Sequence, residues 1–212
     1  MNPAAAIYRL GKKPNPWAAP DWALAGPDGT FGNRFDDPDA IYRVLYASSQ
    51  KLGCFLETLA RFRIDLKLAA ELAEIQGDAD HTPQGEVPVE WIANRIMGVA
   101  TASGEYADIC SSAWISRLRI TLMVDLQKWD IDDFDASVLQ KTAPRTLTQA
   151  VSRIAFNEGL AGIRYLSKHG HDIENWALFE PFQILTLKAQ SIRRDDPSLE
   201  RALQLYSLKF RA

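Results

Sequence analysis

FGNRFDDPDAIYRVLYASSQKLGCFLETLARFR, residues 31–63, is the stretch of sequence that decides the fold. A glycine turn at residues 32–34 precedes Ile41–Tyr46, which is rich in β-branched and aromatic residues and bounded by Asp-Pro and Ser-Ser. That composition predicts a β-strand that ends at Tyr46. The residues that follow predict a helix, because apolar side chains recur at steps of three and four. These side chains are Phe55, Leu59, Phe62 and Leu66.

Glu57 lies on the side of this predicted helix that is opposite the apolar stripe. Its neighbours on that side are the small residues Gly53, Cys54 and Ala60. Small neighbours leave room for a ligand or for another backbone. Two interpretations are open at this point: a carboxylate that faces a binding site, or a carboxylate in water that pairs with Arg61 one turn on.

The segments around this stretch mix strands and helices irregularly, which predicts an α+β fold. The predicted strands are residues 7–10, 162–167, 176–179 and 183–187, with an extended segment at 91–102. The predicted helices are residues 65–77, 148–159 and 197–211. Residues 117–123 fit either a strand or the end of a helix. The predicted loops are 12–32, in which Trp17, Trp22 and Leu24 pack onto the body, 81–88 and a turn at 168–171.

Composition describes an ordinary soluble domain. The 212 residues are 47% apolar and 24% charged, with a net charge of −3, so no global field attracts nucleic acid or an anionic membrane. No apolar run approaches the roughly 18 residues of a membrane span, and the N-terminus lacks the apolar core of a signal peptide. Cys54 and Cys110 lie far apart, and we expect both thiols to be reduced and buried in a cytoplasmic protein.

Metal binding is not expected. The acidic cluster at residues 130–135 lacks the glycine and terminal glutamate of a calcium loop, and it favours a solvated helix start. His169 and His171 form a His-x-His pair without further ligands, so loop histidines are the better interpretation.

Several segments carry motifs that belong together. In chain order they are Ile7–Leu10 (IYRL), 31–35 (FGNRF), 45–48 (LYAS), 54–60 (CFLETLA), 161–167 (AGIRYLS) and 175–179 (NWALF). Together they resemble the RES domain, a family named for an arginine, a glutamate and a serine and known mainly as toxins of bacterial toxin–antitoxin pairs. The resemblance covers Ile7 to about Leu187 and is strongest over 7–63 and 148–187.

The sequence also departs from the family pattern. Leu166 stands where many members have proline, and Lys168-His169 stands where an arginine is more usual. The loop at 12–32 is longer than in compact members, and residues 65–110 resemble an extended insertion.

The resemblance implies a single domain over residues 1–212, with a mixed, split β-sheet flanked by helices as in ADP-ribosyltransferases. It implies an enzyme that breaks the nicotinamide–ribose bond of NAD by phosphorolysis or hydrolysis, as the toxin of a type II toxin–antitoxin pair. NAD would be a consumed substrate, with inorganic phosphate as a possible co-substrate and no cofactor. A cognate antitoxin and a homodimer or larger complex are the implied partners, without membrane or direct nucleic-acid binding.

Site roles follow from the same resemblance. Glu57 and Arg34 are the implied catalytic residues, because bond breakage builds positive charge on the ribose that a carboxylate stabilises, and guanidinium groups bind the diphosphate. The implied substrate-binding residues are Arg9, Tyr46 and Ser167, and the possible rim residues are Tyr8, His169 and His171.

Other interpretations of these residues stay open. Arg34 also fits a solvated loop residue, Tyr46 a core tyrosine with a satisfied hydroxyl, and Ser167 a plain strand end. A serine-hydrolase role has no support, because no histidine–acid partnership accompanies Ser167. Two other functions remain as alternatives: a protein ADP-ribosyltransferase, and a non-catalytic module that binds a nucleotide or a partner.

Overall fold

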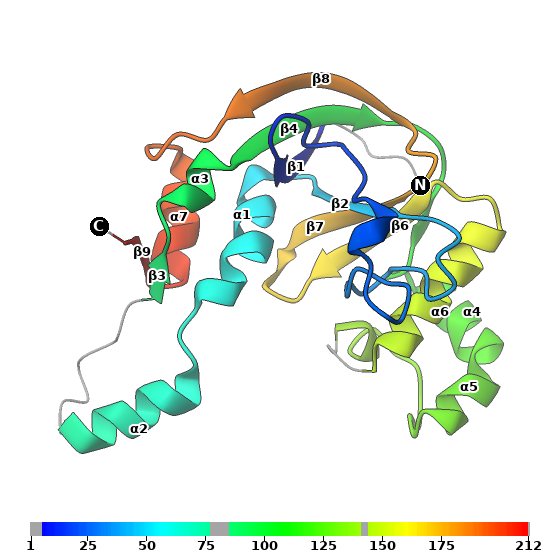
Figure 1. Cartoon of the computed structure of the whole chain (residues 1–212). Helices are drawn as coiled ribbons and strands as arrows, with labels where there is room; N and C mark the ends of the chain where they lie inside the picture. The colour runs from blue at the N-terminus through cyan, green and yellow to red at the C-terminus, as the bar shows by residue number, and fades with distance from the viewer. Residues whose placement is uncertain (1–5, 77–84, 141–143, 212) are drawn as a thin grey trace.

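The chain folds around one seven-stranded mixed β-sheet in the computed structural model, which describes residues 6–76, 85–140 and 144–211. The strands of this sheet are β1 (Ile7–Lys12), β2 (Val44–Ser48), β4 (Arg95–Ala102), β5 (Tyr106–Asp108), β6 (Gly162–Ser167), β7 (Gly170–Phe179) and β8 (Ile184–Ser191). They lie in the order β5-β6-β7-β2-β1-β4-β8 (Figure 1). Two short strands, β3 (Gly85–Val87) and β9 (Leu208–Phe210), form a separate parallel pair.

Helices flank the sheet, which gives the predicted α+β class. The α-helices are α1 (Lys51–Leu59), α2 (Leu66–Gln76), α3 (Glu90–Ala93), α4 (Ser112–Thr121), α5 (Met123–Lys128), α6 (Arg145–Asn157) and α7 (Pro197–Leu205). The 3-10 helices are η1 (Trp22–Leu24), η2 (Ala60–Phe62) and η3 (Val138–Gln140). Figure 1 shows α1 and α7 beside one half of the sheet and α4, α5 and α6 beside the other half.

Apolar packing fixes these helices to the sheet. Phe55 and Leu59, from the predicted apolar stripe of α1, are buried in a cluster that includes Leu199 of α7. On the other half, Val151 and Ala155 of α6 are buried in a second cluster with residues of β6 and β7. Each fully buried large aliphatic or aromatic side chain contributes about 1.5–3 kcal/mol. The position of α1 is therefore set by packing on the side opposite Glu57.

The sheet splits between β1 and β2. These strands share one registered pair, Tyr8 with Ser48, whereas β1 pairs with β4 and β2 with β7 along their whole lengths. Arg43 and Ser49 lie just outside the two ends of the β2–β7 pairing. The Arg43 carbonyl accepts from the Glu180 backbone N–H, and the Ser49 backbone N–H donates to the Glu174 carbonyl, so both face β7. Because bonding direction alternates along an antiparallel strand, the carbonyl of Tyr46 faces β1 across the split. This gap in the ladder is where the predicted site residues meet.

Two boundaries in the deciding stretch differ from the prediction. The strand predicted at 41–46 is β2 at Val44–Ser48, because Ala40 turns the chain with a φ of 53° and delays the extended ladder. Tyr46 therefore lies in the middle of a strand and not at its end. The predicted helix breaks after α1, since the 3-10 turn η2 follows and Arg63 adopts an extended backbone before α2.

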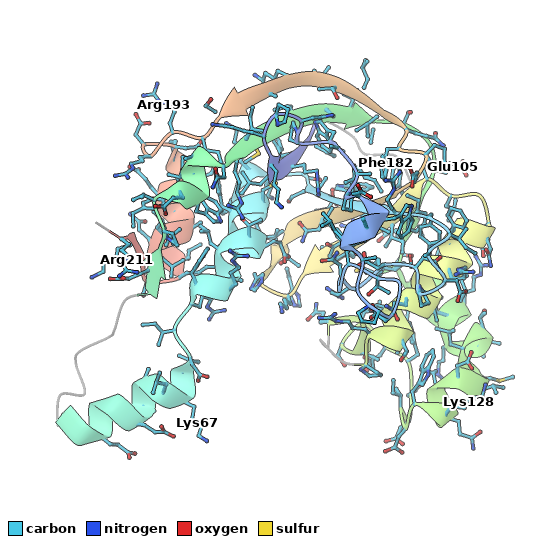
Figure 2. The ribbon with its side chains drawn as sticks, in the orientation of Figure 1. Lys67, Glu105, Lys128, Phe182, Arg193 and Arg211 are labelled. Atoms are coloured by element: carbon cyan, nitrogen blue, oxygen red, sulfur yellow. The ribbon has the colours of Figure 1, made fainter. Side chains whose placement is uncertain are left out.

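The helix predicted at residues 65–77 is α2, but it does not continue the buried stripe. Leu66 is 77% exposed and Leu68 is 53% exposed. The helix projects away from the sheet, as the position of Lys67 shows (Figure 2). The predicted stop at Gly77 and the first part of the loop predicted at 81–88 lie outside the described residues.

In the middle of the chain the structure corrects one prediction and settles one open alternative. The segment predicted as extended at 91–102 begins within α3, and its strand starts at Arg95. Residues 117–123, open between strand and helix, belong mostly to α4, whose start is capped by the Ser111 hydroxyl accepting from the Trp114 backbone N–H. A capping serine seven residues before Leu118 was the local signal for a helix.

Predictions for the acidic cluster and the tail were also partly wrong. Residues 130–135 form a loop rather than an α-helix start, with Asp133 accepting a hydrogen bond from Arg119. The tail was predicted as one helix at 197–211, but the helix α7 ends at Leu205. The chain then turns at Ser207, whose φ is 50°, and continues as β9.

Smaller differences concern boundaries and burial. The helix predicted at 148–159 is α6, which begins earlier, at Arg145. Trp17 is buried as predicted for the 12–32 loop, but Leu24 is 69% exposed. Cys54 is buried and Cys110 is half-buried, and both thiols are free. Within the described part of the chain, no helix combines the length and apolarity that crossing a bilayer requires.

Candidate active site

A cavity of about 340 Å³ opens at the split between β1 and β2. Its walls come from β1, β2, α1, the glycine turn, the β6–β7 hairpin and the first residue of α6. The polar residues that line it are Arg9, Asn33, Arg34, Tyr46, Ser48, Glu57, Thr58, Arg145, Tyr165, Lys168 and Asn175. Four of the five predicted catalytic and substrate-binding residues thus line one cavity, although they come from four separate motifs of the sequence.

Glu57 is held at the cavity wall by two buried donors. Its Oε1 atom accepts hydrogen bonds from Ser167 Oγ at 2.7 Å and from Asn175 Nδ2 at 2.8 Å. Ser167 and Asn175 are 0% and 1% exposed, whereas the Glu57 side chain is 36% exposed. The alternative pairing with Arg61 is not among the contacts of Glu57 in the described structure. The two donors therefore fix Glu57 Oε1, and with it the carboxylate, at the cavity wall.

Gly53 permits α1 to approach the sheet closely enough to place Glu57 there. A Cβ atom at this position would lie 2.2 Å from Ser48 Oγ and 2.8 Å from Ile173 Cγ2. Real Cβ atoms do not approach other atoms this closely, so any side chain would push α1 away from β2 and β7. The predicted small face of the helix is therefore explained partly by backbone packing and partly by the cavity.

Arg9 ties the split together. Its Nη1 atom donates to the Tyr46 carbonyl at 2.7 Å, and its Nε atom donates to the Pro16 carbonyl at 2.8 Å. The guanidinium thus supplies a hydrogen-bond donor to the Tyr46 carbonyl of β2, which faces β1, and it anchors the long loop after β1 through Pro16. Burial lowers the pKa of Arg9 to about 10, so the group remains protonated at neutral pH. Arg9 lines the cavity as predicted, but its bonded contacts are structural.

Arg34 is set by the glycine turn. Gly32 has a φ of 78°, a conformation that favours glycine, and the carboxylate of Asp36 accepts from the backbone N–H groups of Phe31 and Asn33 at 2.9 Å. The guanidinium of Arg34 donates to the Leu139 carbonyl. Its Nε atom is buried without a hydrogen-bond partner in the described structure. Arg34 is therefore half-buried at the cavity wall and is not a solvated loop residue.

The Arg34 guanidinium also lies against two aromatic rings. Its central carbon is 5.3 Å from the centroid of Phe35 and 5.4 Å from that of Tyr165. Cation–π contacts of this kind hold the plane of the group in one orientation.

Tyr46 combines both interpretations that the sequence left open. Its hydroxyl donates to Asp36 Oδ1 at 3.1 Å and accepts from the Phe35 backbone N–H at 3.0 Å, as in a core tyrosine. Burial and the charge of Asp36 raise the pKa of Tyr46 well above its ordinary value. Its side chain also lines the cavity. The hydroxyl is committed to the turn, so the ring is the part available to a ligand.

Two cations of the cavity were not predicted as site residues. Arg145, the first residue of α6, and Lys168, in the β6–β7 turn, both line the wall and are exposed. Neither has an ion-pair partner in the described structure. With Arg9 and Arg34 they place four cationic side chains around one carboxylate, Glu57. The cavity is therefore electropositive in a protein of net charge −3.

The RES domain model matches residues 6–201. The chain belongs to the RES-domain family. Its fold is similar to a chain in the crystal structure of the M. tuberculosis MbcT–MbcA toxin–antitoxin complex, at a TM-score of 0.52 and 12% identity. That likeness covers 97% of this chain and 91% of the other. No curated protein matches the sequence.

Ser167, the expected RES serine, lies behind Glu57 and not on the cavity wall. It is fully buried, its Oγ donates to Glu57, and the same Oγ accepts from the His169 backbone N–H at 3.0 Å. Its hydroxyl is therefore bonded to the Glu57 carboxylate in this structure, and the substrate contact implied for Ser167 stays a prediction.

The predicted rim residues also lie outside the cavity wall. Tyr8 packs beside the α1–α7 cluster, and its carbonyl accepts from the Cys54 thiol at 3.2 Å. His171 is exposed and its Nε2 atom lies 3.3 Å from Gln140 Nε2. His169 points the other way, behind Glu57, with its Nε2 atom 3.7 Å from Glu57 Oε2. Among the described residues, no group of three or more His, Cys, Asp or Glu side chains could hold a metal ion.

Sequence reasoning missed three residues of this RES-domain site. Asn175 stood in a segment quoted for the family resemblance, and its place one strand from Ser167 was a usable signal. Lys168 was noted only as a departure from the family pattern. Arg145 carried no signal, because it lines the cavity only through the packing of α6 against β6.

Proposed function

We propose that this RES-domain protein degrades NAD by breaking the bond between nicotinamide and ribose. The observation that carries the proposal is the Glu57 carboxylate, fixed by Ser167 and Asn175 at the wall of a cavity that otherwise carries positive charge. A carboxylate stabilises positive charge on a sugar ring, and cationic side chains bind the negatively charged diphosphate. NAD has both groups in one molecule.

The chemistry assigns a separate task to each group. As the C–N bond breaks, its electron pair leaves with nicotinamide and positive charge develops on the ribose ring, as in glycoside hydrolysis. A preorganised carboxylate stabilises that charge more strongly than it stabilises bound NAD, which is the condition for catalysis. An oxygen of water or of inorganic phosphate then forms the new bond to the same ribose carbon. Arginine side chains bind phosphate oxygens through two parallel N–H bonds.

The first test is a product assay with the purified protein. We expect incubation with NAD to release nicotinamide, with ADP-ribose as the second product in phosphate-free buffer if water attacks, or its phosphorylated form in phosphate buffer if phosphate attacks. Chromatography of both reactions separates these acceptors. Nicotinamide missing from both buffers would contradict the proposal. Radiolabel from NAD that appears on macromolecules would instead support a protein ADP-ribosyltransferase, and NAD recovered intact after tight binding would support a non-catalytic module.

The free cations allow a second prediction. Changing Arg145 and Lys168 together to alanine removes two positive charges that form no salt bridge in the described structure, and we expect the KM for NAD to rise by about 10- to 100-fold. The effect should fall at high salt, because exposed charges are screened. A matched double variant, Arg193→Ala with Lys188→Ala, removes two exposed cations outside the cavity and should leave KM within about twofold. Equal effects of the two double variants would exclude local diphosphate binding.

The same proposal extends to biology. The solved MbcT–MbcA structure is a toxin–antitoxin complex, and NAD loss is toxic to a cell, so we propose that this chain is the toxin of a type II pair with its own antitoxin. Induced expression in a bacterium should arrest growth and deplete NAD. Expression of the Glu57→Gln variant at the same level should do neither.

A further inference from the structure

The second oxygen of Glu57 faces a buried histidine that has no assigned role. His169 Nε2 lies 3.7 Å from Glu57 Oε2, and the His169 side chain is 7% exposed. The Nε2 atom is buried and has no hydrogen-bond partner in the described structure. A buried polar nitrogen without a partner costs free energy, so its position beside a carboxylate oxygen needs an explanation.

The backbone links the histidine to the same carboxylate. Ser167 Oγ donates to Glu57 Oε1 and accepts from the His169 backbone N–H, so one hydroxyl joins both groups. The imidazole ring also packs against Tyr206, the residue that follows α7, with the centroids 5.7 Å apart in an edge-on arrangement. The ring position is therefore set by the β6–β7 turn and by the end of α7.

The charges that face His169 come from three places in the fold. Glu57 lies on α1, Lys168 lies beside it in the same turn, and Arg63 follows η2 and lies against the ring of Tyr206. Burial lowers the pKa of His169 below its ordinary value of 6.5, while the Glu57 charge opposes that shift. The imidazole is accordingly neutral at pH 7, and it can donate from Nε2 without cancelling the charge of the carboxylate.

We propose that His169 is a positioning residue that donates from Nε2 to Glu57 Oε2 and so aims the carboxylate at the ribose; its catalytic consequence rests on the proposed NAD cleavage. A distance of 3.7 Å is too long for a hydrogen bond, but contacts of this kind often shorten only when substrate is bound. The Ser167–Asn175 pair would then hold one carboxylate oxygen and His169 the other.

Kinetics of three variants test the catalytic consequence. We expect His169→Leu to lower kcat by about 10- to 100-fold with the KM for NAD within twofold, because the loss is in orientation and not in substrate contact. His169→Gln places an amide donor near the position of Nε2 and should recover most of kcat. His171→Leu, two residues further along the hairpin and exposed outside the cavity, should match wild type. Equal losses in the leucine and glutamine variants at position 169 would overturn the proposal.

The pH profile gives a reading that a merely structural histidine would not give. Protonation of His169 puts a positive charge beside Glu57 and cancels the field that stabilises the ribose, so kcat of wild type should fall on the acid side, below pH 6.5. Glutamine does not titrate, so the fall of kcat on the acid side should move to lower pH in His169→Gln. An acid limb at the same pH in both proteins would contradict the assignment.

Titration by NMR separates this inference from the proposed function. In Glu57→Gln the carboxylate that raises the His169 pKa is gone, so the imidazole signal of His169 should titrate at lower pH. An unchanged His169 titration would overturn the pairing whether or not the protein cleaves NAD. A shifted titration in a wild-type protein that releases no nicotinamide would instead reject the proposed function and leave the pairing standing.

Discussion

Glu57→Gln is expected to reduce nicotinamide release by about 100- to 1,000-fold while the protein stays folded. Glutamine has the size of glutamate, and its carbonyl oxygen can still accept from Ser167 Oγ and Asn175 Nδ2. The variant therefore keeps the hydrogen bonds to Ser167 and Asn175, and it loses the negative charge together with the second oxygen, which faces His169. Because that charge is needed as the ribose becomes positive, the loss should fall on kcat more than on KM.

The measurement is steady-state release of nicotinamide, with the far-ultraviolet circular dichroism spectrum as the check on folding. Glu71→Gln removes a carboxylate from the exposed face of α2, away from the cavity, and should leave kcat within twofold. A Glu57→Gln protein with more than a tenth of wild-type kcat would show that the carboxylate is not the group that stabilises the transition state.

Local sequence patterns predicted the parts of this site that depend on nearby residues. The apolar stripe through Phe55 and Leu59 placed α1 on the sheet and left Glu57 on the opposite side, facing the cavity. The glycine turn before Arg34 was predicted as well, because Gly32 adopts a conformation that favours glycine. What local patterns did not predict was the carboxylate of Asp36, which organises that turn through backbone contacts.

The missed features all depend on contacts between distant segments. Arg145 reaches the cavity only because α6 packs against β6, and its own neighbours in sequence show no sign of this. Asn175 and Ser167 lie on paired strands whose register bulges near their joining turn, and that register decides that both side chains point at Glu57. A one-residue change of register would turn each side chain to the other face of the sheet. Register is a property of the assembled sheet, so the Glu57 contacts could not be derived from either strand alone.

For Arg9, the sequence predicted the position at the cavity but did not predict the hydrogen-bond partners. The family resemblance implied a substrate-binding arginine, and the side chain does line the cavity. Its hydrogen bonds, however, go to two backbone carbonyls, one on each side of the split. The gap between β1 and β2 creates that need, since the Tyr46 carbonyl faces a strand with which it has no registered pairing.

Arg9→Met is therefore expected to lower the free energy of unfolding by about 2–4 kcal/mol, the range for leaving two buried carbonyls without a charged donor. Methionine fills much of the same space, so the variant loses the two hydrogen bonds to the backbone carbonyls and keeps most of the packing. Urea unfolding measures it as a lower midpoint at an unchanged m-value. The control is Arg145→Met, which removes an exposed cation of the same cavity that forms no salt bridge in the described structure, and it should stay within about 0.5 kcal/mol of wild type.

The two roles considered for Arg9 separate cleanly in this comparison. If the guanidinium mainly binds the diphosphate, Arg9→Met and Arg145→Met should behave alike, with normal unfolding midpoints and a raised KM for NAD. If it mainly closes the split, Arg9→Met should lose stability, whereas Arg145→Met should lose only affinity. The geometry favours the second result, because both bonded nitrogens of Arg9 are already committed to the backbone. A normal midpoint for Arg9→Met would mean that the β1–β2 gap is held by other contacts, and that the buried charge is kept for the ligand.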